Sequence, residues 1–177
     1  MNKKNVFKKR ILIWDLICLI LLIVIDRITK YLALAHCKKE NYILIQDTLE
    51  ITYLENYGGI LGTLNNQRFF FIFISAIFIC LILFFLFALP NQKKFTFLNI
   101  WLIFIMSGSI GNLLDRIIYG FVVDFIYFSS LNFPVFNLSD IWVSFGMIGT
   151  LIVLVFQLKE KDLEFLNFKQ NKYREIK

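Results

Sequence analysis

Two aspartates at the ends of one Phe-rich segment are the residues most suggestive of chemistry. Asp124 and Asp140 lie within residues 120–140, "GFVVDFIYFSSLNFPVFNLSD", which contain no Lys, Arg or His. Burial raises the pKa of a carboxyl group, and a second carboxylate nearby raises it further. Two such acids can share one proton, so that the ionised member activates a water and the protonated member donates to a carbonyl or a leaving amine. This is the chemistry of an aspartic protease, and it needs no metal, cysteine or histidine.

A structural role explains only one of these two acids. Asp140, like Ser139 before it, suits the N-cap or the first turn of a helix that begins here. Asp124 lies in the apolar context "VVDF", where helix capping offers no explanation.

Asp26 and Lys30 form a second polar group. They are spaced i, i+4 with the acid first, which is the favourable order for an ion pair along a helix. Such a pair could hold a helix bundle together, or it could support a nearby site or contact a lipid headgroup.

A third polar group is "GNLLDR", residues 111–116, which brings Asn112, Asp115 and Arg116 to one helix end. Arginine at a helix C-terminus suits the helix dipole. These residues could cap the helix, or Asn112 and Arg116 could bind a substrate backbone or a phosphate.

The nearest basic residues in the sequence favour one pair of acids. Asp115 adjoins Arg116 and Asp26 has Lys30, so both have ready counter-charges. Asp124 and Asp140 have none, which favours them as the proton-sharing pair on electrostatic grounds.

Other catalytic chemistries find little support. Cys18, Cys37 and Cys80 form no CxxC pair, which argues against a zinc site or a redox pair. His36 is the single histidine, so an HExxH helix is excluded, and no GxSxG motif occurs. We expect no metal and no cofactor.

The elements that must position these residues are apolar helices. Of the 177 residues, 58% are hydrophobic and 21 are Phe, against roughly 45–50% apolar residues in soluble domains. Uncharged apolar runs cover residues 69–89, 95–114 and 141–158. Each is close to the roughly 20 residues that cross a bilayer as a helix, so the composition predicts an integral membrane protein.

Residues 11–36 predict a further span, although Asp15, Asp26, Arg27 and Lys30 interrupt it. The basic start and "ALAHC" imitate a cleaved signal peptide, but the charges inside the run argue against cleavage. The predicted fold is therefore an all-α membrane protein with four transmembrane helices, at about 11–36, 68–89, 95–116 and 140–158, in a single domain over residues 1–177.

The basic residues predict the orientation. The N-terminus, the link at 90–94 and the tail from Lys159 together hold 13 of the 19 Lys and Arg residues, and cytoplasmic flanks are rich in both. Both termini are then cytoplasmic. The net charge of +6 reflects this topology and attraction to lipid headgroups, not a nucleic-acid partner.

Two segments, about 37–67 and 117–139, remain on the extracytoplasmic side. Short alternation around residues 43–53 and a turn at "NYGG" predict a small β-sheet between the first two helices, and the mixed-charge tail predicts a solvated helix or a frayed end. The topology brings the polar groups to one membrane face: Asp26, Lys30, Asn56, Gly58, Asn112, Asp115, Arg116, Asp124, Asn137 and Asp140.

The ordered motifs "DRITK", "ENYGG", "GNLLDR", "VVDF" and "FNLSD" resemble those of bacterial lipoprotein signal peptidase, the type II signal peptidase, over nearly the whole chain. The resemblance implies an intramembrane aspartic endopeptidase in the bacterial cytoplasmic membrane. Such an enzyme removes the signal peptide of a diacylglyceryl-modified prolipoprotein by cutting just before the lipidated cysteine.

The same resemblance implies the roles of individual residues. Asp124 and Asp140 match the catalytic pair. Other characteristic positions match residues expected to bind substrate or support the site, namely Asp26, Lys30, Asn56, Gly58, Asn112, Arg116 and Asn137. Asn112, Asn137 and Arg116 would hydrogen-bond the extended substrate, and the outer sheet with the Asn56–Gly58 turn would clamp it.

Two departures from the family pattern occur. The family usually reads N-x-G-A-A-F where this chain has "NYGGIL", and usually has Ala where this chain has Ser139. Both concern loop packing and substrate fit more than the chemistry. The expected partners are prolipoproteins and membrane phospholipids, with the chain acting as a monomer.

Two other classes of protein fit part of the pattern. A small transporter or channel would use Asp26, Lys30 and Asp140 as an ion path, but such a path should cross the membrane, and only Asp15 breaks the apolar inner half. A non-catalytic membrane scaffold would not need the outer cluster of polar groups.

Overall fold

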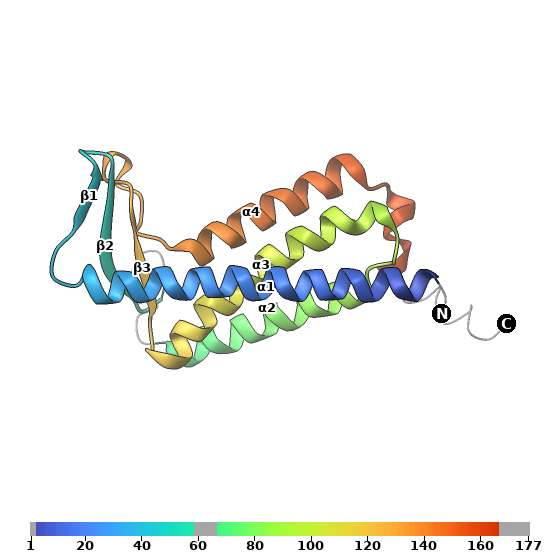
Figure 1. Ribbon diagram of the computed structural model, residues 1–177, viewed down its shortest axis with the longest axis horizontal. Helices are drawn as coiled ribbons and strands as arrows, with labels where there is room; N and C mark the ends of the chain where they lie inside the picture. The colour runs from blue at the N-terminus through green and yellow to red at the C-terminus, as the bar shows by residue number, and fades with distance from the viewer. Residues whose placement is uncertain (1–2, 59–66, 167–177) are drawn as a thin grey trace.

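The structure is a computed structural model that describes residues 3–58 and 67–166. Its four long helices lie side by side, and a small sheet stands across one end of them (Figure 1). The helices are α1 (Lys3–His36), α2 (Arg68–Ala88), α3 (Thr96–Ile118) and α4 (Leu138–Ile152), the last continued by the π-helical turn η3 (Val153–Gln157). The strands are β1 (Tyr42–Ile45), β2 (Leu49–Asn56) and β3 (Val122–Tyr127), and the short 3₁₀ helices are η1 (Lys93–Phe95), η2 (Ser129–Leu131) and η4 (Glu160–Leu166).

Helix α3 lies at the centre of the bundle and contacts each of the other three helices. It packs most closely on α4, because α4 presents glycines where the backbones approach. A Cβ at Gly146 would come within 2.7 Å of the Trp101 carbonyl oxygen, and one at Gly149 would overlap the Trp101 ring. Small residues that let helices approach this closely are typical of helix packing in membranes.

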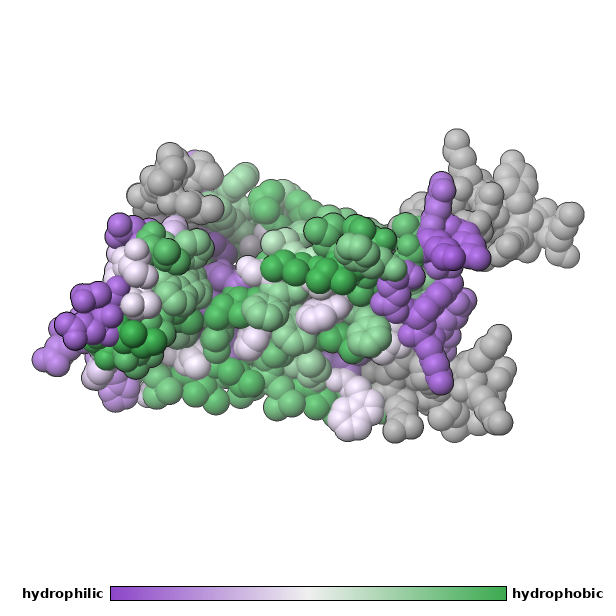
Figure 2. All heavy atoms as spheres, turned by 90° about the horizontal axis from the view of Figure 1, so that it is seen from above, coloured by the Kyte–Doolittle hydropathy of each residue, from purple (hydrophilic) through white to green (hydrophobic). Residues whose placement is uncertain are grey.

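The surface has an apolar band between two polar ends (Figure 2). Three helical stretches are long and apolar enough to cross a membrane: Arg68–Ala88, Lys93–Ile118 and Leu138–Gln157. Helix α1 is long enough at 34 residues, but it carries Asp15, Asp26, Arg27 and Lys30 and is not among them. The predicted helix positions are confirmed to within a few residues at most ends, whereas the predicted count of four membrane spans is not confirmed.

The prediction of a sheet confined to the segment between α1 and α2 was wrong in one respect. The sheet has three antiparallel strands in the order β1-β2-β3, and β3 comes from the segment between α3 and α4. The register pairs Leu54 with Asp124 and Asn56 with Val122. This pairing fixes Asp124 on a strand, close to the polar ends of the helices.

The chain after α4 also differs from the predicted solvated helix or frayed end. Its first part, η4, folds back against the link between α2 and α3, where Leu163 and Phe165 pack on a buried apolar cluster that includes Phe95 and Leu98. The rest of the tail lies outside the described residues.

Candidate active site

The two predicted acids come together through Asn137. The Asn137 side-chain nitrogen donates to Asp124 Oδ1 at 2.6 Å, and the Asn137 backbone N–H donates to Asp140 Oδ2 at 3.0 Å. Both carboxyl groups therefore contact one residue, although Asp124 lies on β3 and Asp140 on α4. The assignment of these two acids as a catalytic pair stays a prediction.

Asp124 is almost completely buried, with 1% of its surface exposed. Its second oxygen, Oδ2, accepts a hydrogen bond from the Asn56 side-chain nitrogen at 2.8 Å. Burial raises the pKa of Asp124 to about 6; the Asn56 hydrogen bond opposes this rise and the charge of Asp140 adds to it. A carboxyl group with a pKa in this range can act as a general acid close to neutral pH.

Asp140 lies in the first turn of α4 and completes a capping box with Asn137. The Asp140 N–H donates to Asn137 Oδ1 at 3.1 Å, and the Asn137 N–H returns a hydrogen bond to Asp140 Oδ2. The other Asp140 oxygen accepts from the Asn112 side-chain nitrogen at 2.8 Å. Both Asp140 oxygens therefore accept hydrogen bonds from N–H donors at the N-terminus of α4.

The orientations of the asparagine amides follow from the groups around them. Lys30 can only donate, and its Nζ lies 2.9 Å from Asn112 Oδ1, so the Asn112 nitrogen must face Asp140. The Gly58 N–H likewise donates to Asn56 Oδ1 at 3.0 Å, which directs the Asn56 nitrogen at Asp124. Each amide is thus turned so that a donor faces a carboxyl group.

Asn112 and Asn137, which were expected to hydrogen-bond the substrate, contact the two carboxyl groups instead. Both side chains hydrogen-bond the carboxyl groups in the free chain, and Asn137 is fully buried. Their direct contact with a substrate remains a prediction.

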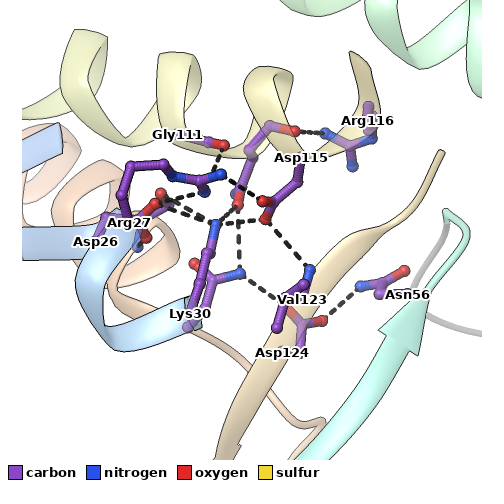
Figure 3. Close-up of polar contacts among 12 residues, drawn as sticks. Asp26, Arg27, Lys30, Asn56, Gly111, Asp115, Arg116, Val123 and Asp124 are labelled. Atoms are coloured by element: carbon purple, nitrogen blue, oxygen red, sulfur yellow. Dashed lines mark hydrogen bonds and ion pairs between the residues drawn. The ribbon is translucent and has the colours of Figure 1, made fainter. Parts of the chain in front are cut away.

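A buried ion cluster joins α1 to α3 close to Asp124 (Figure 3). Lys30 Nζ lies 3.3 Å from Asp26 Oδ2 and 2.8 Å from Asp115 Oδ2, and Arg27 contacts the same two acids at 2.8 and 2.6 Å. The predicted Asp26–Lys30 pair is confirmed. Asp26, Lys30 and Asp115 are all at most 2% exposed. Their pairing therefore compensates for the loss of water around these charges.

Arg116 was the wrong counter-charge to predict for Asp115. Residues adjacent on a helix point in different directions, and Asp115 faces Arg27 and Lys30 instead. The sequence reasoning also missed Arg27, which donates to the Gly111 carbonyl at 3.0 Å besides pairing with both acids. Its only signal was its place next to Asp26 inside an apolar run.

The cluster also fixes the strand and helix that carry the acids. The Val123 N–H donates to Asp115 Oδ2 at 3.2 Å, and the Ser139 N–H donates to Asp26 Oδ1 at 3.0 Å. These are the residues immediately before Asp124 and Asp140. The ion cluster thereby holds the backbone of β3 next to Asp124 and the backbone of α4 next to Asp140.

Arg116 does not take part in the buried ion cluster. Among the described residues its guanidinium makes no ion pair within 4 Å; it donates weakly to the Asn112 carbonyl at 3.4 Å and lies 5.0 Å from the Phe71 ring centre. It borders a cavity of about 260 Å³ lined by Ser75, Phe78, Ser109, Asn112, Arg116, Asp140, Val143 and Ser144. The cavity opens beside Asp140 and brings one cation to the edge of the carboxyl pair.

A metal centre has no ligand set in the part of the chain that the structure describes, since no three His, Cys, Asp or Glu side chains gather in a way that could hold an ion. Gly58 adopts φ 124°, as expected for a glycine turn, whereas the departure at residues 59–61 lies outside the described residues. Ser139, the other departure, is fully buried and lies 3.4 Å from Lys30 through its hydroxyl.

Comparison with known proteins gives concordant results. A family model described as signal peptidase (SPase) II matches residues 18–156. A lipoprotein signal peptidase of Clostridium tetani is 38% identical over 85% of this chain and 96% of its own length, and one of Brevibacillus brevis is 35% identical over 81% and 95%. A solved bacterial membrane enzyme superposes with a TM-score of 0.71 at 27% identity, covering 82% of this chain and 92% of the other.

Proposed function

The chain belongs to the signal peptidase II family, and we propose that it removes signal peptides from prolipoproteins with a pair of aspartates, Asp124 and Asp140. The observation that carries this proposal is the contact of both carboxyl groups with Asn137, at 2.6 and 3.0 Å, in a buried setting. Acids so placed interact and are expected to titrate as a pair.

The two acids differ in ways that suggest their roles. Asp124 is buried with a pKa of about 6 and is expected to hold the proton. Asp140 is surrounded by N–H donors at a helix N-terminus and is expected to be ionised. A substrate that displaces water from the site would raise the pKa of Asp124 further.

These roles give a balanced hydrolysis. Asp140 takes a proton from a water whose oxygen bonds to the scissile carbonyl carbon, while Asp124 gives its proton to the carbonyl oxygen. In the collapse of the resulting diol, Asp140 passes its proton to the amide nitrogen as the carbon–nitrogen bond breaks. Asp124 recovers a proton from the diol, so the pair returns to its starting state and releases an acid and an amine.

Arg116 is proposed as the main substrate-binding cation of the site. It borders the cavity beside Asp140 and makes no ion pair with a described acid, so its N–H groups can donate to substrate carbonyls. Asn56 and Asn112 hold the carboxyl groups. The Asn56–Gly58 segment of the sheet would cover the substrate from above.

We further propose the membrane arrangement. Helix α1 is the fourth span, because Asp26, Arg27 and Lys30, three of the charges that interrupt its apolar run, are paired inside the bundle. The sheet end, with the carboxyl pair, would face the extracytoplasmic side of a bacterial cytoplasmic membrane, where a diacylglyceryl-modified cysteine places its peptide bond. All these groups come from one chain, which is consistent with a functional monomer in contact with phospholipid.

A cleavage assay on a lipid-modified precursor in liposomes tests the proposal. Asp124→Asn and Asp140→Asn should each lower kcat by at least about 10²-fold, the range of general acid–base catalysis. Asp15→Asn is the matched control, because Asp15 lies eleven residues before Asp26 on α1 and borders a different cavity. Wild-type cleavage by either variant of the pair, or strong inhibition of the wild type by EDTA, would contradict the mechanism.

A further inference from the structure

A second cavity, of about 340 Å³, lies at the end of the bundle opposite the sheet. Its walls come from the end of α2, from α3 and from α4 with η3, and its floor comes from Leu163 and Phe165 of η4. In contrast to the cavity beside Asp140, its accessible surface is entirely apolar. The site described above does not use it.

The two cavities lie on the same faces of the same three helices. Residues spaced i, i+3, i+4 or i+7 share one helix face. On α3 this face runs from polar to apolar, from Asn112 and Ser109 to Leu102 and Leu98. On α4, Val143 of the outer cavity lies seven residues before Thr150 of the inner cavity, and Leu154 follows on η3. Ile82 and Ile105 are buried between the two cavities and separate them.

Helix η4, which forms the floor of the inner cavity, contacts the link between α2 and α3. Lys94 Nζ lies 2.6 Å from Asp162 Oδ1, and the Lys159 N–H donates to Asp162 Oδ2 at 3.2 Å. Phe165 meets Phe95 edge to face, with 5.6 Å between ring centres. The floor lies beyond residues 18–156, the part of the chain that the family model matches.

The spacing of the cavities fits the apolar segment of a signal peptide. From Asp140 to Thr150 and Leu154 is 10 and 14 residues of helix, or roughly 15 to 21 Å at 1.5 Å per residue. The apolar segment of a signal peptide has about 7–15 residues, or roughly 10 to 22 Å as a helix. With its cleavage site at Asp140, such a segment would begin at the inner cavity.

An acyl chain of the lipidated cysteine fits less well. A chain that starts at the outer boundary ends near the middle of a hydrocarbon core of about 30 Å. The inner cavity lies at the far end of the helices, directly above the polar pair Lys94–Asp162.

We propose that the inner cavity binds the first apolar residues of the signal peptide, and that Leu163 and Phe165 set the longest apolar segment this chain accepts. The inference rests on the proposed function, because it requires a signal peptide as substrate. It makes η4 a specificity element outside the catalytic site.

Two precursors that differ only in the length of the apolar segment, about 10 and about 15 residues, test this inference. The wild type should cleave the long precursor with a KM about tenfold higher. Phe165→Ala removes a side chain from the floor and deepens the inner cavity. The ratio of KM for the long precursor to KM for the short precursor should then fall to about two, while kcat for the short precursor stays unchanged. Lys161→Gln, an exposed change on the same segment, should keep the tenfold ratio.

An unchanged ratio in Phe165→Ala, with full activity on the short precursor, would overturn the inference. So would an effect of Phe165→Ala that depends on the surrounding lipid but not on segment length, since this would assign the cavity to an inner-leaflet lipid. If Phe165→Ala fails to fold, the milder Leu163→Ala gives the same comparison.

Crosslinking separates this inference from the proposed function. Leu163→Cys, in an Asp124→Asn background that retains uncleaved substrate, should crosslink to a cysteine placed at the start of the apolar segment and not to one near the cleavage site. Asp124→Asn without Leu163→Cys is the control, because it shows any crosslinks formed by the three native cysteines. Crosslinking only near the cleavage site would overturn the inference even with the peptidase activity established, whereas wild type that cleaves neither precursor would contradict the proposed function.

Discussion

Replacing Asp124 by Asn should remove a pH-dependent destabilisation of the folded protein while abolishing cleavage. The pKa of Asp124 rises from an ordinary 3.8 to about 6, mainly through burial. Each pKa unit corresponds to about 1.4 kcal/mol, so ionised Asp124 costs the folded state about 3 kcal/mol above pH 6. An asparagine has the shape of the carboxyl group and never carries this charge.

The sign follows from proton binding. Between pH 3.8 and about 6 the folded state holds a proton on Asp124 that the unfolded state has lost, so wild-type stability falls as the pH rises through this window. Asn keeps one protonation state throughout. The free energy of unfolding of Asp124→Asn relative to wild type should therefore be about 2.4 kcal/mol higher at pH 8 than at pH 4, because part of the effect is already present at pH 4.

Thermal unfolding in detergent at both pH values measures this difference. The Tm gap is the Tm of Asp124→Asn minus the Tm of the wild type. For a chain of this size, about 2.4 kcal/mol corresponds to a change in this gap of roughly 5 to 10 °C. Asp47→Asn is the matched control, because Asp47 is exposed and Asn accepts its left-handed backbone (φ 55°). A Tm gap that is equal at pH 4 and pH 8 would refute the assignment of Asp124 as a desolvated acid.

Three other substitutions separate stability from catalysis. Asp140→Asn should abolish cleavage but destabilise the chain by about 1 kcal/mol, because it weakens the capping box, and a rise in Tm would contradict this. Gly111→Ala should lower Tm, because its Cβ would overlap the Ser139 hydroxyl, and Ser139→Ala should restore part of the loss; no rescue would show that other contacts dominate. Lys30→Met should lower the free energy of unfolding by about 3–5 kcal/mol, because it leaves buried Asp115 with one cation fewer. The double variant Lys30→Met/Asp115→Asn should recover part of this loss. A free energy of unfolding of Lys30→Met equal to that of the wild type would disprove that the pair stabilises the fold.

The helices were predictable from the sequence because membrane spans depend on the length of an apolar run, which is a local property. The same holds for the i, i+4 pair of Asp26 and Lys30. The candidate acids were predictable because no basic residue accompanies Asp124 or Asp140 in the segment that holds them.

Two features were not predictable, for a common reason. Strand β3 reads "VVDFIY" and its first four residues are all buried, so it lacks the alternation that marks a half-exposed strand. The ion pair of Arg27 and Asp115 joins residues 88 positions apart, whereas the sequence suggested the adjacent Arg116. Both depend on packing between distant elements.

The buried ion cluster has a consequence for the biogenesis of the protein. In the proposed membrane arrangement, helix α1 brings Arg27 and Lys30 into the apolar layer with Asp26 as their one partner from the same helix, and charges at that depth cost a few kcal/mol each. The second acid, Asp115, arrives only with α3, after α2 has been synthesised. The ion pairs of the first helix synthesised are thus complete only after α3, a helix made much later, has joined it.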